Sequence, residues 1–160
     1  MILTQPGERH ELLARSKTVA MVGASRDPLR PSYTVFSFVR TGGLFSIAPI
    51  NPKVEEIDGI RAYPSLVEYA RAHGAPDIVD VFRNPASVLP VVEESIAIGA
   101  KAIWFQYGVI NDEAIARADA AGLDVVVDRC LKVEIARFNG GLATAGLNSG
   151  VITSRRSGVR

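Results

Sequence analysis

The junction at residues 21–36, MVGASRDPLRPSYTVF, decides the fold class of this chain. An apolar run ends there at Gly23, a polar loop follows, and an amphipathic segment begins near Ser32. This order predicts a strand, a loop and a helix, which dinucleotide-binding units join through the sequence G-x-G-x-x-G. Here Ser25 and Pro28 stand where the second and third glycines would be. The junction therefore indicates a nucleotide-binding type of fold but leaves the ligand of the loop open.

The same alternation continues along the rest of the chain. Five short apolar runs are bounded by Gly, Pro, Asn or Asp, which is typical of buried parallel strands. We predict these strands at residues 17–24, 44–50, 76–82, 101–106 and 122–128. Helices with one apolar face are predicted at residues 6–15, 32–42, 64–73, 85–98 and 111–121. Helices between strands imply βαβ crossovers, so the expected fold is α/β: a doubly wound, mainly parallel five-stranded sheet with helices on both faces.

Size, composition and charge exclude several classes of protein. The 160 residues are 48% hydrophobic and 22% charged, which is ordinary for a single globular domain. The formal net charge of +1 disfavours a nucleic-acid partner, because nucleic-acid-binding domains usually carry a basic surface. No run approaches the roughly 18 apolar residues of a membrane span, and the first residues lack a signal-peptide core. Cys130 is the single cysteine, so a reducing, cytoplasmic setting is expected. From the charge and the apolar runs together, we expect neither a membrane nor a nucleic-acid partner.

The last part of the chain differs in composition. From Asn139 onward it holds five glycines and many Ser and Thr, with charges only at Arg155, Arg156 and Arg160. Such a composition is typical of a flexible segment. We therefore expect a globular domain over residues 1–138 and a flexible Gly/Ser/Arg-containing tail over residues 139–160.

Polar residues gather where the predicted strands end, which is where doubly wound sheets bind ligands. After the first strand, Gly23 permits close approach of the backbone, and the Ser25 hydroxyl suits a phosphate. Arg26 and Arg30 add positive charge to this loop. Pro31 fixes the start of the following helix, whose N-terminal amides can face an anion. The loop can hold a phosphate without three glycines; a proline-stiffened connection without a ligand is the alternative.

The end of the second strand distinguishes between cofactors. NAD-binding units carry a carboxylate there for the ribose hydroxyls, whereas this chain continues after Ile50 with Asn51, Pro52 and Lys53. Glu55 follows only later, in a loop. Lys53 suits a phosphate on the ribose, which NADP carries and which coenzyme A (CoA) carries at its 3′ position. A solvated loop lysine is the alternative.

Several blocks of the sequence together resemble one known family. They are VGASRDPLRPSY, PINPK, DIVDVFRNP, IGAKAIWFQYGV and VVVDRC, in this order, over about residues 12–138. These blocks are similar to those of the small stand-alone CoA-binding proteins, which resemble the CoA-binding domain of the succinyl-CoA synthetase α subunit. The resemblance implies a Rossmann-like CoA-binding domain over residues 1–138, with CoA or an acyl-CoA as its ligand.

The resemblance also implies which residues form the site. The diphosphate would lie among Gly23, Ala24, Ser25 and Arg26, with Ser32 and Tyr33 beside them. The adenosine and its phosphate would meet Asn51, Pro52 and Lys53. Phe82, Arg83 and Pro85 would line the adenine or pantetheine side, and Gln106 and Gly108 would approach the pantetheine arm.

We expect a non-catalytic binding module rather than an enzyme. The sequence shows no Ser-His-Asp set, no carboxylate pair at a strand end and no metal-ligand cluster. Ligase α subunits continue into a second domain that supplies a phosphorylated histidine, whereas His10 and His73 are expected on the surface of this single domain. The alternatives are the NADP-binding domain of a reductase-like protein and a ligand-free interaction domain. Partners beyond CoA would be further copies of the chain or a larger acyl-CoA enzyme complex.

Five further residues allow expectations about chemistry and packing. Cys130 is expected to be a small buried apolar residue, because free cysteine is among the most buried residue types; a thiol whose pKa is lowered by the preceding Arg129 is the alternative. Trp104 and Phe105 are expected in the core. Asp77 and Asp80 bracket the third predicted strand and are expected to serve its edges and turns.

Overall fold

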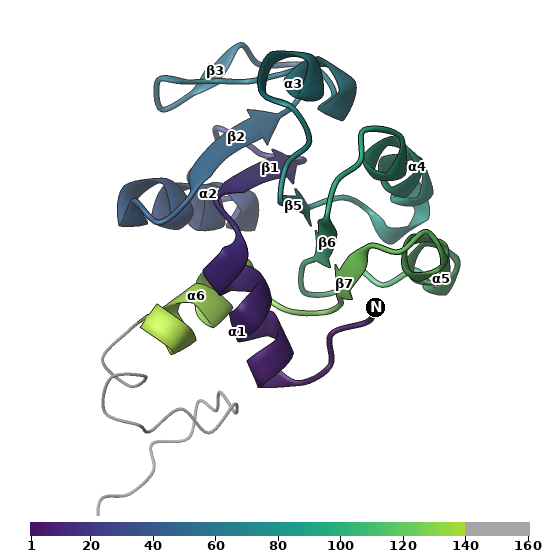
Figure 1. Ribbon diagram of the computed structural model, residues 1–160. Coiled ribbons are helices and arrows are strands. Elements are labelled where there is room, and N and C mark those ends of the chain that lie inside the picture. Colours follow the sequence, from purple (N-terminus) through teal and green to yellow (C-terminus); the bar gives the residue numbers. More distant parts are fainter. Residues whose placement is uncertain (140–160) are drawn as a thin grey trace, which may run out of the picture.

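A five-stranded parallel sheet forms the centre of the molecule, in a computed structural model that describes residues 1–139 (Figure 1). Its strands are β1 (Thr18–Val22), β2 (Ser46–Ile50), β5 (Ile78–Val81), β6 (Ala102–Phe105) and β7 (Asp124–Val126). They lie in the order β2-β1-β5-β6-β7, and every neighbouring pair is parallel. The predicted doubly wound parallel sheet and all five of its strands are confirmed.

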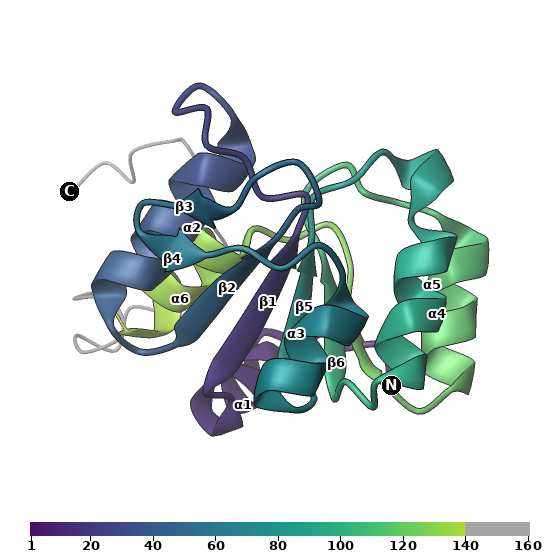
Figure 2. The same cartoon turned by 90° about the horizontal axis from the view of Figure 1, so that it is seen from above.

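Three helices cover each face of the sheet (Figures 1 and 2). One face carries α1 (Pro6–Arg15), α2 (Pro31–Gly42) and α6 (Leu131–Asn139), and the other carries α3 (Leu66–His73), α4 (Leu89–Ala97) and α5 (Asp112–Ala120). Because both faces are covered, strand residues of either orientation are buried and the strands read as continuous apolar runs. Within residues 1–139, no helix is long and apolar enough to cross a membrane.

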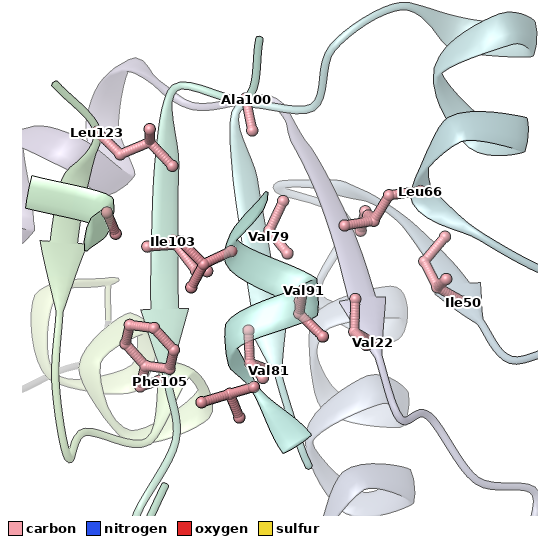
Figure 3. Close-up of a cluster of buried hydrophobic side chains, with 14 of the residues drawn as sticks. Val22, Ile50, Leu66, Val79, Val81, Val91, Ala100, Ile103, Phe105 and Leu123 are labelled. Carbon is pink, nitrogen blue, oxygen red and sulfur yellow. The ribbon is translucent and has the colours of Figure 1, made fainter. Parts of the chain in front are cut away.

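The core consists of two apolar clusters, one on each side of the sheet. Figure 3 shows the cluster on the α3–α5 side. Val91 of α4 lies over the sheet there, close to Val79 and Val81 of β5 and Phe105 of β6. On the other side Trp104 packs with residues of α1, α2 and α6. Trp104 and Phe105 are both fully buried, as predicted.

The strand order fixes where a ligand site lies. From β1 the chain crosses through α2 to β2 on one side, and then returns past β1 through α3 to β5 on the other side. The carboxyl ends of β1 and β5 therefore form the topological switch point, the usual binding crevice of such sheets. Because all five strands are parallel, the loops that follow them emerge at one edge, which we call the carboxyl edge.

Three features of the fold differ from the sequence predictions. A hairpin of β3 (Glu56–Ile57) and β4 (Ile60–Arg61) follows β2, closed by Asp58 and Gly59 at φ 50° and 79°. These left-handed residues are typical of a tight hairpin turn, but two-residue strands give no readable alternation. The helix predicted at 85–98 is divided into a 3-10 turn η1 (Pro85–Ser87) and α4. Helix α6 was not predicted, although Leu131, Ile135 and Phe138 have helical spacing.

The predicted domain boundary is only partly described by the structure. Asn139, expected to begin the tail, is the last residue of α6. Residues 140–160, and with them the expectation of a flexible tail, lie outside the described residues.

Candidate functional site

Two neighbouring pockets open at the carboxyl edge. The first, which we call the switch-point pocket, has a volume of about 390 Å³. Its lining residues are Gly23, Ala24, Ser25, Arg30, Pro31, Ser32, Asn51, Phe82, Arg83, Asn84 and Val109. The second, the α3–α4 pocket, has a volume of about 520 Å³ and reaches from the ends of β1 and β2 to the first turns of α3 and α4. Arg83 lines both pockets and so stands between them.

Gly23 allows the two strands of the switch point to continue side by side. Its φ is +82°, and a Cβ at this position would lie 1.9 Å from the carbonyl oxygen of Phe82. The amide of Gly23 donates to the carbonyl of Ile50 at 3.2 Å, while the amide of Phe82 donates to that of Val22 at 2.9 Å. Any side chain would therefore meet the protein's own backbone. The close approach expected at Gly23 is confirmed, but it is an approach within the protein.

The loop after β1 is shaped by its own side chains. The Ser25 hydroxyl accepts a hydrogen bond from the amide of Asp27 at 3.0 Å. The carboxylate of Asp27 in turn accepts from the amide of Leu29 at 2.9 Å. A hydroxyl that accepts one hydrogen bond still has its own proton to donate. Ser25 therefore stabilises the shape of the loop, and its hydroxyl can still donate a hydrogen bond to a phosphate oxygen in the pocket.

Helix α2 begins at the switch-point pocket without a side-chain cap. Its N-cap residue, Arg30, makes no capping side-chain hydrogen bond, and Pro31 occupies the first helical position. Helices α3 and α5, by contrast, begin at Ser65 and Asn111, whose side chains accept hydrogen bonds from the amides of their first turns. A helix N-terminus carries a partial positive charge and unpaired amides, which favour an anion. The start of α2 is therefore suited to a phosphate at the wall of this pocket.

Asn51 links the loops that follow β1 and β2. Its side-chain amide donates to the carbonyl of Ala24 at 2.8 Å, and its side-chain oxygen accepts from the amide of Lys53 at 2.8 Å. Asn51 thus occupies the position after β2 where an NAD-binding unit carries its carboxylate. The side chain is used to hold the two loops together, and Glu55 lies further along, in a separate hollow under the hairpin.

Positive charge surrounds the pockets unevenly. The side chains of Arg30 and Arg83 are exposed and line the switch-point pocket. Arg26 and Lys53 are also exposed but line neither of the two pockets. The two lining arginines therefore supply the cationic surface at the switch point.

A comparison with protein families identifies the domain. The family model described as a CoA binding domain matches residues 17–136. The chain belongs to the CoA-binding domain family. This CoA-binding domain is 38% identical over 126 residues to the uncharacterized protein YneT of Bacillus subtilis (strain 168), covering 79% of this chain and 90% of that protein.

Two further relatives show the domain alone and within a larger protein. A hypothetical protein from Pyrococcus horikoshii OT3 has a solved structure that matches this CoA-binding domain with a TM-score of 0.80 at 38% identity, covering 86% of this chain and 94% of that one. The ADP-forming acetate–CoA ligase II of Archaeoglobus fulgidus is 33% identical over 79 residues, which is 48% of this chain and 11% of the ligase. The predicted resemblance to stand-alone CoA-binding proteins is confirmed.

The structure brings most of the predicted site residues of this CoA-binding domain to the carboxyl edge. Seven line the switch-point pocket: Gly23, Ala24, Ser25, Ser32, Asn51, Phe82 and Arg83. Pro52 lines the α3–α4 pocket. Arg30, Asn84 and Val109 line the switch-point pocket as well, although they were not among the predicted CoA contacts. Each of them follows a strand end or precedes a helix, and this position in the sequence could have indicated that they lie at the site. The contacts of these residues with CoA stay predictions.

Six predicted contact residues line neither pocket. Arg26 and Lys53 lie in the loops around the pockets, and Pro85 begins η1. Three others have protein partners: the hydroxyl of Tyr33 donates to Asp58 of the hairpin at 2.9 Å, the amide of Gly108 donates to Asp128 at 2.9 Å, and Gln106 is buried. Groups that are hydrogen-bonded or buried within the protein can shape the loops, but they have less freedom to reach a ligand.

Asp80 is the buried acid of the sheet, and its predicted role at strand edges and turns is wrong. It lies inside β5, fully buried, and its Oδ1 accepts a hydrogen bond from Gln106 at 2.5 Å. Its Oδ2 has no hydrogen-bond partner among the described residues. Burial raises the pKa of Asp80 to about 7, against smaller lowering by Gln106 and the Val81 amide. An acid inside the run IVDV was the sequence signal for this position.

Asp77, by contrast, has the expected role at a strand start. Its carboxylate accepts from the amides of Lys17 and Thr18 at 2.7 and 3.1 Å, and from Lys101 at 2.6 Å. Burial alone would raise the pKa of Asp77, but these hydrogen bonds lower it to about 2. The ionised carboxylate therefore ties the beginning of β1 to β5 and β6.

Cys130 does not have the features of the alternative, a thiol with a lowered pKa. Burial raises the pKa of its thiol, and nearby backbone amides only partly oppose this. The guanidinium of Arg129 instead donates to the carbonyl of Asp128 at 2.8 Å. Cys130 packs against the core cluster on the α1–α2–α6 side, in agreement with the prediction of a small apolar residue.

Both histidines are exposed, as predicted. His10 lies on α1 and stacks on Phe138 with ring centroids 4.6 Å apart. His73 ends α3, and its Nε2 is 2.6 Å from the hydroxyl of Tyr63. Within the described residues, no three His, Cys, Asp or Glu side chains are grouped so that they could hold a metal ion.

Proposed function

We propose that this chain binds CoA or an acyl-CoA at the carboxyl edge and performs no chemistry on it. One observation carries the proposal: the uncapped N-terminus of α2 meets the loop of Gly23–Arg30 at the switch point, beside the exposed Arg83. Backbone amides, a helix dipole and two arginines form an anion-binding surface there. CoA has a diphosphate to fill such a surface, and membership of the CoA-binding domain family supports this ligand.

The diphosphate belongs in the switch-point pocket. Gly23, Ala24 and Ser25 present backbone on one wall, and Ser32 lies in the first turn of α2 on the same side. Arg83 faces both pockets, so a ligand held by its phosphates at the first pocket can continue into the α3–α4 pocket. An extended nucleotide ligand fits two joined pockets better than a free phosphate does.

The end of β2 favours CoA over NAD. Asn51, which stands where NAD-binding units carry an acid, is bonded to Ala24 and Lys53. The side chain of Lys53 is exposed beside this loop and would pair with the 3′-phosphate of CoA. NADP also carries a ribose phosphate, so the experiment below compares the affinities of the protein for CoA and for NADP.

A binding role without catalysis is supported by the positions of the titratable groups. General acid–base chemistry near neutral pH most often uses histidine. His10 stacks on Phe138, and His73 lies at the far end of α3 from the carboxyl edge. The thiol of Cys130 has a raised pKa, which disfavours the nucleophilic thiolate.

Calorimetric titration with CoA, 3′-dephospho-CoA and NADP tests the ligand. A charged hydrogen bond contributes about 1.5–3 kcal/mol, or roughly 10- to 150-fold in affinity. We expect CoA to bind more tightly than dephospho-CoA by such a factor, and Lys53→Gln to remove this preference. Arg83→Gln should weaken the binding of CoA and of dephospho-CoA by the same factor. Arg71→Gln, an exposed arginine in the last turn of α3, is the matched control and should change neither.

The titrations also define the contrary results. Equal affinities of the unaltered protein for CoA and dephospho-CoA would remove Lys53 from the site. Tighter binding of NADP than of CoA would replace the proposed ligand. An unchanged affinity in Arg83→Gln would place the ligand elsewhere.

A further inference from the structure

An apolar groove lies on the opposite side of the sheet from the α3–α4 pocket. It is lined by Phe38, Val39 and Gly42 of α2, by Leu44 and Phe45 after α2, and by Ile135, Ala136 and Asn139 of α6. Its volume is about 310 Å³, roughly twice that of a cavity of about 150 Å³ that holds benzene. Leu44 is 52% exposed at the groove. The groove therefore has room for one or two aliphatic side chains.

The chain itself continues from the wall of this groove. Asn139, the last residue of α6, is one of the lining residues. Leu142 is three residues further on, and an extended chain spans at most about 3.3–3.6 Å per residue. Leu142 is thus tethered within about 11 Å of Asn139. Residues 140–154 contain Leu142, Leu147, Val151 and Ile152 and no Asp, Glu, Lys or Arg.

We propose that the segment Leu142–Leu147 covers the groove between α2 and α6. The transfer of an aliphatic side chain from water into an apolar groove is favourable, and its free energy is proportional to the apolar area that is buried, at roughly 25 cal/mol per Å². The tether supplies an effective concentration in the millimolar range, which a separate partner does not have. Gly140 and Gly141 permit the turn back from the end of α6.

The size of the groove favours this occupant over a second copy of the chain. Stable protein interfaces bury about 1,200–2,000 Å² in total, whereas a groove of about 310 Å³ accepts only one or two side chains. The family match ends at residue 136, so the segment lies outside the matched domain. This inference concerns the face of α2 and α6 and does not rest on CoA binding.

Photo-crosslinking in the full chain tests the proposal. A benzophenone amino acid replaces Leu44, the half-exposed residue of the groove, and the crosslinked peptides are identified by mass spectrometry. We expect an intramolecular crosslink to residues 140–154, with a yield that does not change over a hundredfold dilution. Leu142→Asp combined with Leu147→Asp should reduce the yield to background, because two charges would have to enter an apolar groove.

A matched variant separates packing from added charge. Thr144→Asp combined with Asn148→Asp adds the same charge at polar positions in or next to this segment and should retain at least half of the crosslink. Equal loss in both double variants would overturn the proposal, as would the absence of a crosslink to residues 140–154. A crosslink between two molecules that fades on dilution would also overturn it, and would assign the groove to a second copy of the chain.

Discussion

Replacement of Asp80 by Asn should make the stability of this domain less dependent on pH. Asp80 is fully buried in β5, with Gln106 bonded to one oxygen and no described partner for the other. Its pKa is about 7 in the folded protein against 3.8 for the ordinary side chain. Between these values the unfolded chain releases the proton while the folded protein keeps it. The free energy of unfolding therefore falls as pH rises from about 4 to about 7, and stays level above that range.

The size of the effect follows from the two pKa values. Each pKa unit corresponds to about 1.36 kcal/mol, so the ionisation of Asp80 costs on the order of 4 kcal/mol at pH 8. Asn has the shape of Asp and can still accept from Gln106, but it cannot ionise. Its side-chain amide needs new partners, which costs about 1–3 kcal/mol at every pH. The diagnostic quantity is therefore the pH dependence of the difference between the two proteins, and not the difference at one pH.

Urea unfolding of both proteins at pH 4, 5, 6, 7 and 8 measures this difference. The stability of Asp80→Asn relative to the unaltered protein should increase from pH 4 to pH 7 and then level off. Asp77→Asn is a control of opposite sign, because the pKa of Asp77 is lowered to about 2. It should be destabilised by about 2 kcal/mol at every pH from 4 to 8, because this loss fades only as the pH falls from about 4 to about 2. A difference for Asp80→Asn that is constant from pH 4 to pH 8 would refute the reasoning.

Other parts of the structure give further expectations. Gly23→Ala should lower the free energy of unfolding by about 3 kcal/mol or more, from a backbone clash at 1.9 Å and a left-handed φ; Gly42→Ala, in open space on α2, should be neutral or stabilising in the same thermal melts. Arg9→Met should cost about 3 kcal/mol in urea unfolding, because the buried Glu134 loses its nearer arginine partner at 3.2 Å and keeps only Arg137 at 3.6 Å; a loss below about 0.5 kcal/mol would contradict this. Incubation with acetyl- or succinyl-CoA should release no thiol above background, and turnover that disappears in Cys130→Ala would make the chain an enzyme.

The sequence by itself determined the order and type of the main elements. Alternation of short apolar runs with amphipathic segments is a local property of the chain, and each element is fixed by residues close to one another in sequence. The loop after β1, with Gly23 at its start, could be located in the same way. Elements with a weak local pattern, such as the two-residue strands of the hairpin, were missed.

Tertiary structure alone decided which strand ends meet and what environment each side chain has. Gly23 and Phe82 are distant in sequence, and they meet because β5 pairs with β1 on the side away from β2. The same pairing buries Asp80 and raises its pKa, and the packing of α2 and α6 raises that of Cys130. Burial and hydrogen-bond partners depend on residues far apart along the chain, and a local pattern carries no information about them.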